Sequence, residues 1–392
     1  MKCNGLLLLI LCAIRSSAAD VDDPTLVTLP EGQIRGQALR SPNDNVYYAF
    51  QEVPYAAPPV GALRFQAPVA LAKWEGILNT TKNEKICYQG GDVYIPIPEL
   101  NPTEDCLYLN VYTPLKPGQT SQTPLPVLIW IHGGGFETGT GAIQIFKPGF
   151  VIDHDIVVVT INYRVVALGF LTTEDGVIPG NLGLKDQHFA FQWVKNNIHL
   201  FGGDPEKITI SGESAGGASV GLQLVSQRNK GLFRGAILQS GTSVAQWAHQ
   251  NYARFYAFEL ARSLDPSFTS DNSTELLELL QSFPASNINN NTVTAAVGKE
   301  SALLGSLIWL PVIEEASLDG ALITGLFHED IRTGNINQVP IIIGFNSEEA
   351  LLFLNSDPSD VEVRAKYFDS DLSNLIRNQF NMTKEKQTDS WH

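Results

Sequence analysis

Basic residues are scarce in this chain. Its 392 residues include 26 Lys and Arg against 41 Asp and Glu, so the formal net charge is −15. There is no run of basic residues and no interleaving of basic with aromatic residues. Nucleic acids and anionic membrane surfaces repel such a chain, and we expect it to bind neither. The hydrophobic share of 44% is that of an ordinary globular protein, so most of the chain should fold.

Long apolar runs are absent after the first residues. Near the N-terminus, Lys2 precedes an apolar segment at 6–14, and Ser17-Ala18-Ala19 provides the small residues of a cleavage site. The segment is too short to span a bilayer. We therefore predict that residues 1–19 are a secretory signal peptide and that the protein is secreted. No later stretch is apolar enough to cross a membrane, so no stable anchor is expected.

Cysteine is rare as well. Of the four cysteines, Cys3 and Cys12 lie in the predicted signal peptide, which leaves Cys87 and Cys106. Two cysteines without other thiol partners usually join in an oxidising compartment, so we predict this disulfide. No histidine lies near either cysteine in the sequence, and a metal site is not expected.

Export gives meaning to the sequence triplets that accept N-linked glycans. Four asparagines begin an N-x-S/T triplet without proline, and they are candidate glycosylation sites. They are Asn79, Asn272, Asn290 and Asn381.

Segments typical of strands alternate with segments typical of helices. This alternation predicts an α/β architecture, with a mostly parallel central sheet covered by helices on both faces. The Asn-rich stretch at 286–294 is expected to be a loop. Expected strands lie at 107–112, 127–131, 156–161, 208–211, 236–238 and 340–344, after a hairpin at 26–39. Expected helices lie at 188–199, 215–226, 252–264 and 274–283.

The sequence Gly212-Glu213-Ser214-Ala215-Gly216 has the G-x-S-x-G pattern and lies between an expected strand and an expected helix. In this context the pattern indicates a tight turn that exposes a nucleophilic serine above the sheet. The helix that follows directs its N-terminal N–H groups at developing negative charge. An ordinary glycine-rich turn is the alternative.

A second glycine-rich sequence, His132-Gly133-Gly134-Gly135-Phe136, follows the expected strand at 127–131. Three glycines let the backbone approach a ligand and present bare N–H donors. Upstream of the serine turn, this pattern indicates an oxyanion-hole loop. Two such patterns in this order argue against a chance match.

The chain resembles the type-B carboxylesterase and cholinesterase family of α/β-hydrolases, and it is most similar to insect secreted carboxylesterases. The resemblance covers nearly everything after the signal peptide and implies one α/β-hydrolase domain over residues 20–392. Its matching stretches are PYAAPPVGALRF at 54–65, EDCLYLNVYTP at 104–114, PVLIWIHGGGF at 126–136, INYRVVALGFL at 161–171, and 181–217, from NLGLKDQ to SGESAGG.

The resemblance assigns roles position by position. Ser214 matches the family nucleophile, and Gly134, Gly135 and Ala215 match the three oxyanion donors. Glu349 matches the acid of the triad.

Supporting positions match too. Ser240 matches a family serine that helps to hold the acid, and Cys87 and Cys106 match the first family disulfide. The family usually has Gly where Ala350 stands.

A histidine base is missing from the expected place. In this fold the order along the chain is serine, acid, histidine. After Glu349 the only histidine is His392, the last residue, which follows a polar tail without a matching motif. We therefore expect the domain to be incomplete at its C-terminus, lacking the last strands and helices. Catalysis by the chain as given would be strongly reduced, and the alternative is an esterase-like protein that binds or sequesters esters without turnover.

The resemblance implies a carboxylic ester hydrolase that forms an acyl-enzyme at Ser214 and needs no metal or organic cofactor. Cholinesterases of the family carry a Trp between the first two disulfide cysteines as the floor of the choline site. No Trp lies between Cys87 and Cys106, so choline esters are not expected. Juvenile-hormone esterases typically have Gln where Glu213 stands. Short-chain aliphatic or aromatic esters remain as substrates, and the oligomeric state is left open.

Overall fold

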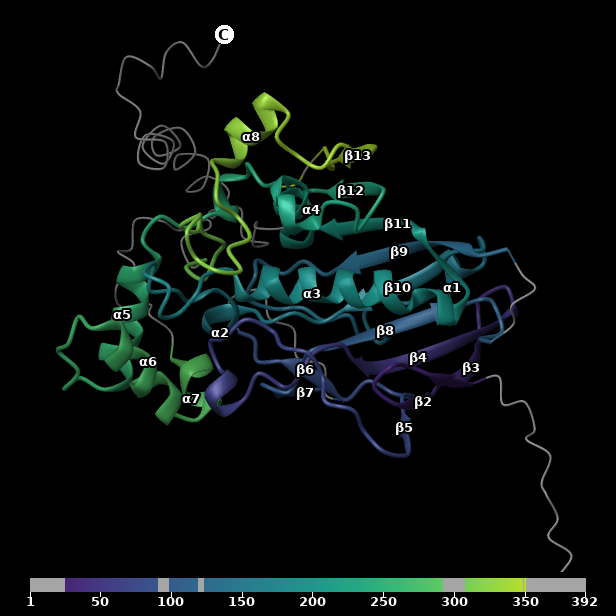
Figure 1. Cartoon of the computed structure of the whole chain (residues 1–392), viewed down its shortest axis with the longest axis horizontal. Helices are drawn as coiled ribbons and strands as arrows, with labels where there is room; N and C mark the ends of the chain where they lie inside the picture. Colours follow the sequence, from purple (N-terminus) through teal and green to yellow (C-terminus); the bar gives the residue numbers. More distant parts are fainter. Residues whose placement is uncertain (1–24, 91–98, 119–122, 292–306, 348, 350–392) are drawn as a thin grey trace, which may run out of the picture.

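The computed structural model describes residues 25–90, 99–118, 123–291, 307–347 and 349. A central sheet crosses the molecule with the strand order β13-β12-β11-β9-β10-β8-β4-β3 (Figure 1). These strands are β3 (Gln37–Arg40), β4 (Val46–Pro54), β8 (Tyr108–Thr113), β9 (Leu125–Ile131), β10 (Val157–Ile161), β11 (Gly203–Glu213), β12 (Gly235–Gln239) and β13 (Ile341–Gly344).

The type of strand pairing changes once along the sheet. The neighbours from β13 to β10 are parallel, whereas β8, β4 and β3 add on in antiparallel fashion. The expected mostly parallel sheet is confirmed, with an antiparallel extension at one end.

Helices pack on both faces of the sheet, because neighbouring residues of a buried strand point to opposite sides. Val157 and Val159 of β10 belong to the large core that also contains α3 (Leu182–Asn197) and α4 (Ala215–Val225). Val158, between them, packs instead with Ile152 of α1 (Gly149–Ile152).

A group of helices lies beside the sheet, on the left in Figure 1. It consists of α5 (Ala253–Leu264), α6 (Ser273–Ser282) and α7 (Ala285–Asn290). The short α2 (Val166–Phe170) contacts α7, and α8 (Phe327–Thr333) contacts α4. The remaining elements are β1 (Leu26–Thr28), β2 (Gln33–Arg35), β5 (Ile77–Asn79), β6 (Lys85–Cys87), β7 (Asn101–Thr103), η1 (Gly61–Leu63), η2 (Ile198–Phe201), η3 (Gln227–Asn229) and η4 (Gln246–Ala248).

The loop expected at 286–294 is wrong in its first part, which forms α7. Pro284 precedes this helix, and the side chains of Ala285 and Ile288 are buried on one side of it. Packing of these two residues outweighs the weak helix preference of the asparagines around them. Residues 292–294 lie outside the described part of the chain.

Helix α3 begins at Leu182, six residues before the expected start at His188. Its first turns carry polar residues that the interior pairs. Asp186 forms an ion pair with Arg164 at 2.7 Å, and Lys185 donates to Glu314, all four side chains being at most 6% exposed. Because these partners lie far away in the sequence, the amphipathic pattern did not reveal the start of the helix.

The hairpin expected at 26–39 is present only in part. β1 and β2 are antiparallel, and the Leu29 N–H donates to the Gly32 carbonyl across the turn. They form a small sheet with β5, whereas residues 37–40 join the central sheet as β3.

The predicted disulfide is present. Cys87 and Cys106 are joined at 2.07 Å, and both are buried. No helix in the described ranges is both long and apolar enough to cross a membrane.

Candidate active site

Ser214 stands at the junction of β11 and α4, at the carboxyl end of the central strands. Its backbone has φ 55° and ψ −122°, a conformation that a non-glycine residue rarely adopts. The Ser214 N–H donates to the Gln239 carbonyl at 2.8 Å, and its carbonyl accepts from the Ala218 N–H at 2.9 Å. Hydrogen bonds from two other elements therefore hold the strained turn that the G-x-S-x-G pattern predicts.

The glycines of this turn are required by close backbone contacts. A Cβ atom on Gly212 would lie 2.4 Å from the Gly216 carbonyl oxygen. A Cβ atom on Gly216 would lie 2.1 Å from the Ile131 carbonyl oxygen of β9. The pattern thus marks where α4 passes against β9 and β11.

The glycine loop packs against the serine turn. A Cβ atom on Gly133 would lie 3.1 Å from the Cβ of Ser214. Gly134 and Gly135 have φ values of 103° and 65°, which favour glycine. Ala215, the third predicted donor, is the first residue of α4, where backbone N–H groups have no partner inside the helix. The structure therefore brings Gly133, the neighbour of the predicted donors Gly134 and Gly135, against Ser214, and Ala215 follows Ser214 in the chain.

His132 packs against Tyr163 and contacts the glycine loop. It is 5% exposed, its ring stacks on Tyr163 at 4.2 Å, and the Tyr163 hydroxyl donates to the His132 carbonyl at 2.9 Å. Its Nδ1 lies 2.9 Å from the Gly133 carbonyl oxygen, so Nδ1 carries the hydrogen. Burial lowers the pKa of His132 to about 4, against an opposing effect of the Gly133 carbonyl, and the ring is neutral near pH 7.

Glu349 follows β13 and is held by two donors. The Ser240 hydroxyl donates to its Oε1 at 2.6 Å, and the Asn346 N–H donates to the same oxygen at 2.7 Å. The Ser240 hydroxyl is the main reason that the pKa of Glu349 is lowered. Ser240 itself has φ 53° at the end of β12, and its N–H donates to the Gly344 carbonyl at 2.8 Å.

Glu213 is a second carboxylate of the site. Burial raises its pKa, and the negative charge of Glu349 raises it further. The Ser214 N–H donates to the Gln239 carbonyl, and the next residue, Ser240, donates to Glu349, so the predicted acid lies at the same end of the sheet as the serine turn. The sequence analysis used Glu213 only to compare the chain with juvenile-hormone esterases. Its position next to Ser214 could also have indicated that its charge acts on the site.

No histidine among the described residues is hydrogen-bonded to Ser214 or Glu349. His188 lies 2.7 Å from the Asn229 amide oxygen, and His249 packs edge-on against Phe327. His392 lies outside the described residues.

The other candidate sites are distributed over the surface. Asn79, Asn272 and Asn290 are exposed, and Asn381 lies outside the described residues. Asn272 also caps α6, because its side-chain oxygen accepts from the Thr274 and Glu275 N–H groups. Within the ranges that the structure covers, no three His, Cys, Asp or Glu side chains are grouped so that they could hold a metal ion.

Comparison with known proteins agrees with this geometry. The model of the carboxylesterase family matches residues 23–391. This chain belongs to the carboxylesterase family. Its α/β-hydrolase fold follows from that membership and from the mixed, mostly parallel sheet. The chain is 37% identical over 362 residues to a cholinesterase of Mus musculus, which covers 89% of this chain and 57% of the relative. The chain thus spans somewhat more than half the length of that relative.

Proposed function

We propose that this protein is a serine carboxylesterase that hydrolyses carboxylic esters through an acyl-enzyme at Ser214. The observation that carries the proposal is the strained turn at Ser214 packed against the Gly133–Gly135 loop. Family membership supports it, since the fold alone hosts many chemistries.

In this mechanism the Ser214 hydroxyl oxygen attacks the ester carbonyl carbon. The N–H groups of Gly134, Gly135 and Ala215 donate to the oxyanion that forms. A histidine accepts the serine proton and returns it to the leaving alcohol, while Glu349 orients this base. Water then attacks the acyl-enzyme and releases the acid. Among the described residues no histidine is hydrogen-bonded to Ser214 or Glu349, and we assign no residue as this base.

For the substrate we propose short-chain aliphatic or aromatic esters. The relative named above is a cholinesterase, but the segment between Cys87 and Cys106 contains no Trp to receive a choline cation. Glu213 argues against the juvenile-hormone specialisation of the family.

A second candidate is an esterase-like protein that binds or sequesters esters without turnover. It is favoured by one observation, the lack of a histidine hydrogen-bonded to Ser214 among the described residues. Retention of Ser214 and both oxyanion glycines favours the hydrolase instead.

We also propose that the protein is secreted after removal of residues 1–19 and glycosylated. Three of the four candidate asparagines, Asn79, Asn272 and Asn290, are exposed, which fits attached glycans.

Turnover of p-nitrophenyl butyrate tests the hydrolase against the binder. The hydrolase releases nitrophenol continuously, and Ser214→Ala abolishes the release. Ser282→Ala, which changes an exposed serine on α6, is the control and retains the full rate. Stoichiometric ester binding without release in the folded parent chain would replace the hydrolase with the binder.

A further inference from the structure

A cavity of about 300 Å³ lies between the 243–251 segment, the 312–313 segment and the start of α8. Several separate segments of the chain supply its walls. The lining residues that bear on ligand binding are Glu174, Val244, His249, Val312, Leu326 and Phe327.

This cavity shares no lining residue with the serine site, although its 243–251 wall begins two residues after Gly241, which packs against the Ser214 carbonyl. None of the lining residues belongs to the serine turn, the glycine loop or the acid. Ser243 lies against Gly221, since a Cβ atom on Gly221 would be 2.6 Å from the Ser243 nitrogen. Gly221 is seven residues beyond Ser214 on α4, a distance of about 10 Å along a helix.

The walls of the cavity are mostly apolar on one side. Val244, Val312, Leu326 and Phe327 contribute aliphatic and aromatic surface, and His249 packs edge-on against Phe327 at 5.1 Å. Val244 and Leu326 remain 48% and 53% exposed, so the cavity has an apolar mouth. The volume is about twice the ~150 Å³ of an apolar cavity that holds benzene, which leaves room for roughly a dozen heavy atoms.

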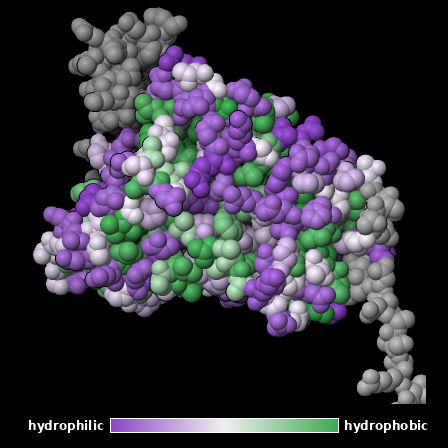
Figure 2. Space-filling view, viewed as in Figure 1, coloured by the Kyte–Doolittle hydropathy of each residue, from purple (hydrophilic) through white to green (hydrophobic). Residues whose placement is uncertain are grey.

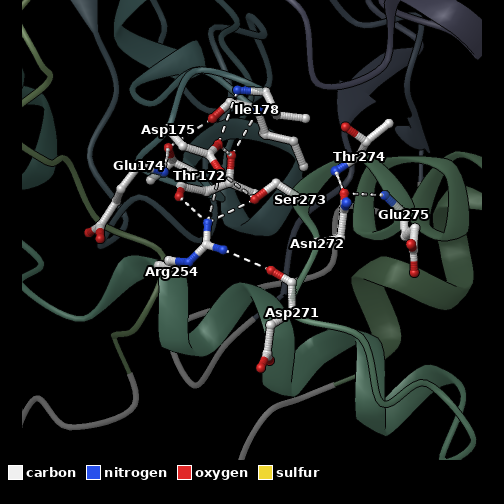
Figure 3. Close-up of polar contacts among 12 residues, drawn as sticks. Thr172, Glu174, Asp175, Ile178, Arg254, Asp271, Asn272, Ser273, Thr274 and Glu275 are labelled. Carbon is white, nitrogen blue, oxygen red and sulfur yellow. Dashed lines mark hydrogen bonds and ion pairs between the residues drawn. The ribbon is translucent and has the colours of Figure 1, made fainter.

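Glu174 gives the cavity a negative rim. Burial raises the pKa of Glu174, and the backbone N–H groups of Arg254 and Ala253 at the start of α5, together with the Arg254 charge, oppose this rise. The Arg254 guanidinium is engaged elsewhere, because it donates to the Thr173 carbonyl, the Asp175 carboxylate and the Ser273 hydroxyl. Figure 3 shows the Glu174 carboxylate turned away from this cluster. Glu174, Asp175 and Arg254 together carry two carboxylates and one guanidinium. Their net negative charge favours a cation at the rim of the cavity.

We propose that this cavity is a second small-molecule site that binds a monocationic amphiphile, with its ammonium group at Glu174 and its apolar body against Val244, Val312 and Phe327. The site goes beyond ester hydrolysis and does not involve Ser214. The face of the molecule seen in Figure 2 mixes hydrophilic and hydrophobic residues. The cavity combines the Glu174 carboxylate with apolar walls.

Calorimetric titration of the full chain carrying Ser214→Ala tests the proposal, because that variant separates this site from turnover. Three probes share one octyl chain and differ in charge: octylammonium, 1-octanol and octanoate. We expect octylammonium to bind at least tenfold more tightly than 1-octanol, and octanoate to bind most weakly. Equal binding of all three probes would overturn the proposal.

Two variants locate the binding. Val244→Trp fills the mouth and should weaken octylammonium binding at least tenfold, whereas Val60→Trp changes a similarly exposed valine (44%) that does not line the cavity and should leave binding unchanged. Glu174→Gln keeps an acceptor for the α5 N–H groups and should remove the preference for octylammonium over 1-octanol. Glu278→Gln, an exposed carboxylate on α6, is its control.

Octylammonium binding that survives Val244→Trp, or a charge preference that survives Glu174→Gln, would refute the assignment. Near-ultraviolet circular dichroism checks that each variant remains folded. Failure of the esterase proposal leaves these results unaffected, because every titration is done without the nucleophile.

Discussion

The two halves of the candidate active site are built in opposite ways. Ser214 and the glycine loop lie where β9, β11 and α4 meet, and the backbone packs so closely there that a Cβ atom added to Gly133, Gly212 or Gly216 would lie within 3 Å of a neighbouring backbone atom. Glu349 instead follows β13, whose isoleucines 341, 342 and 343 are 43%, 66% and 60% exposed, with Phe345 at 83%. In the part of the chain that the structure describes, β13 pairs only with β12. The nucleophile half is therefore fixed by close packing, and the acid half by a few hydrogen bonds at the sheet edge.

Exchange of one glycine in each half gives the largest expected contrast. Gly216→Ala places a methyl group 2.1 Å from the Ile131 carbonyl oxygen, which should lower the free energy of unfolding by about 3 kcal/mol or more. The better helix preference of alanine offsets only about 1 kcal/mol of this. Gly344→Ala meets open space and should change the value by less than about 0.5 kcal/mol. Urea unfolding measures both, and equal values would remove the contrast.

Lowering the pH should reduce the stability contributed by the two halves in different pH ranges. His132 titrates at about 4 in the folded chain against 6.5 when free, a difference that corresponds to about 3 kcal/mol. The unfolded chain binds this proton more tightly, so stability is complete above pH 6.5 and is lost as the pH falls towards 4. Glu349 has the lowered pKa of a stabilised carboxylate, so its contribution is lost only below its free value of 4.5.

Urea unfolding at a series of pH values checks this, with His132→Gln as the variant. The variant should lose most of the dependence between pH 6.5 and 4 and keep the dependence below 4.5. A parent and a variant with identical curves would show that His132 is not buried as the structure has it.

Matched isoleucines in the two halves should give a smaller difference. Ile129 of β9 is 0% exposed, and Ile129→Val should cost about 1 kcal/mol because it leaves a cavity. Ile342 of β13 is 66% exposed, and Ile342→Val should cost less than about 0.5 kcal/mol. Thermal unfolding measures the pair, and a larger cost at Ile342 would mean that β13 is covered in solution.

The smallest effect is expected at the support of the acid. Ser240→Ala removes the hydroxyl that donates to Glu349, so the pKa of Glu349 should rise towards 4.5. Carbon-detected NMR titration of the carboxyl groups follows this change, and Ser282→Ala is the control. An unaltered pKa of Glu349 in Ser240→Ala would show that this hydrogen bond does not hold the acid.

The sequence predicted best what depends on neighbouring residues. The strands, the turn at Ser214 and the loop at Gly133 were visible because glycine requirements and apolar runs are local. The start of α3 was missed because Lys185 and Asp186 are paired with residues far along the chain. Helix α7 was missed because its two buried residues are few among asparagines.

Two contacts between distant segments were not predicted from the sequence. The interaction of Glu213 with Glu349 joins the ends of β11 and β13. The cavity at Glu174 likewise combines residues from 174 to 328. The roles of Ser214, Glu349 and the three oxyanion positions remain predictions that activity must test.

Fluorophosphonate labelling of the folded full chain, with the modified residue located by mass spectrometry, tests the central claim most directly. We predict a single adduct on Ser214, formed at a rate that falls when the chain is unfolded in urea. An adduct on another residue, or no adduct while circular dichroism shows a folded chain, would contradict the assignment of Ser214 as the nucleophile.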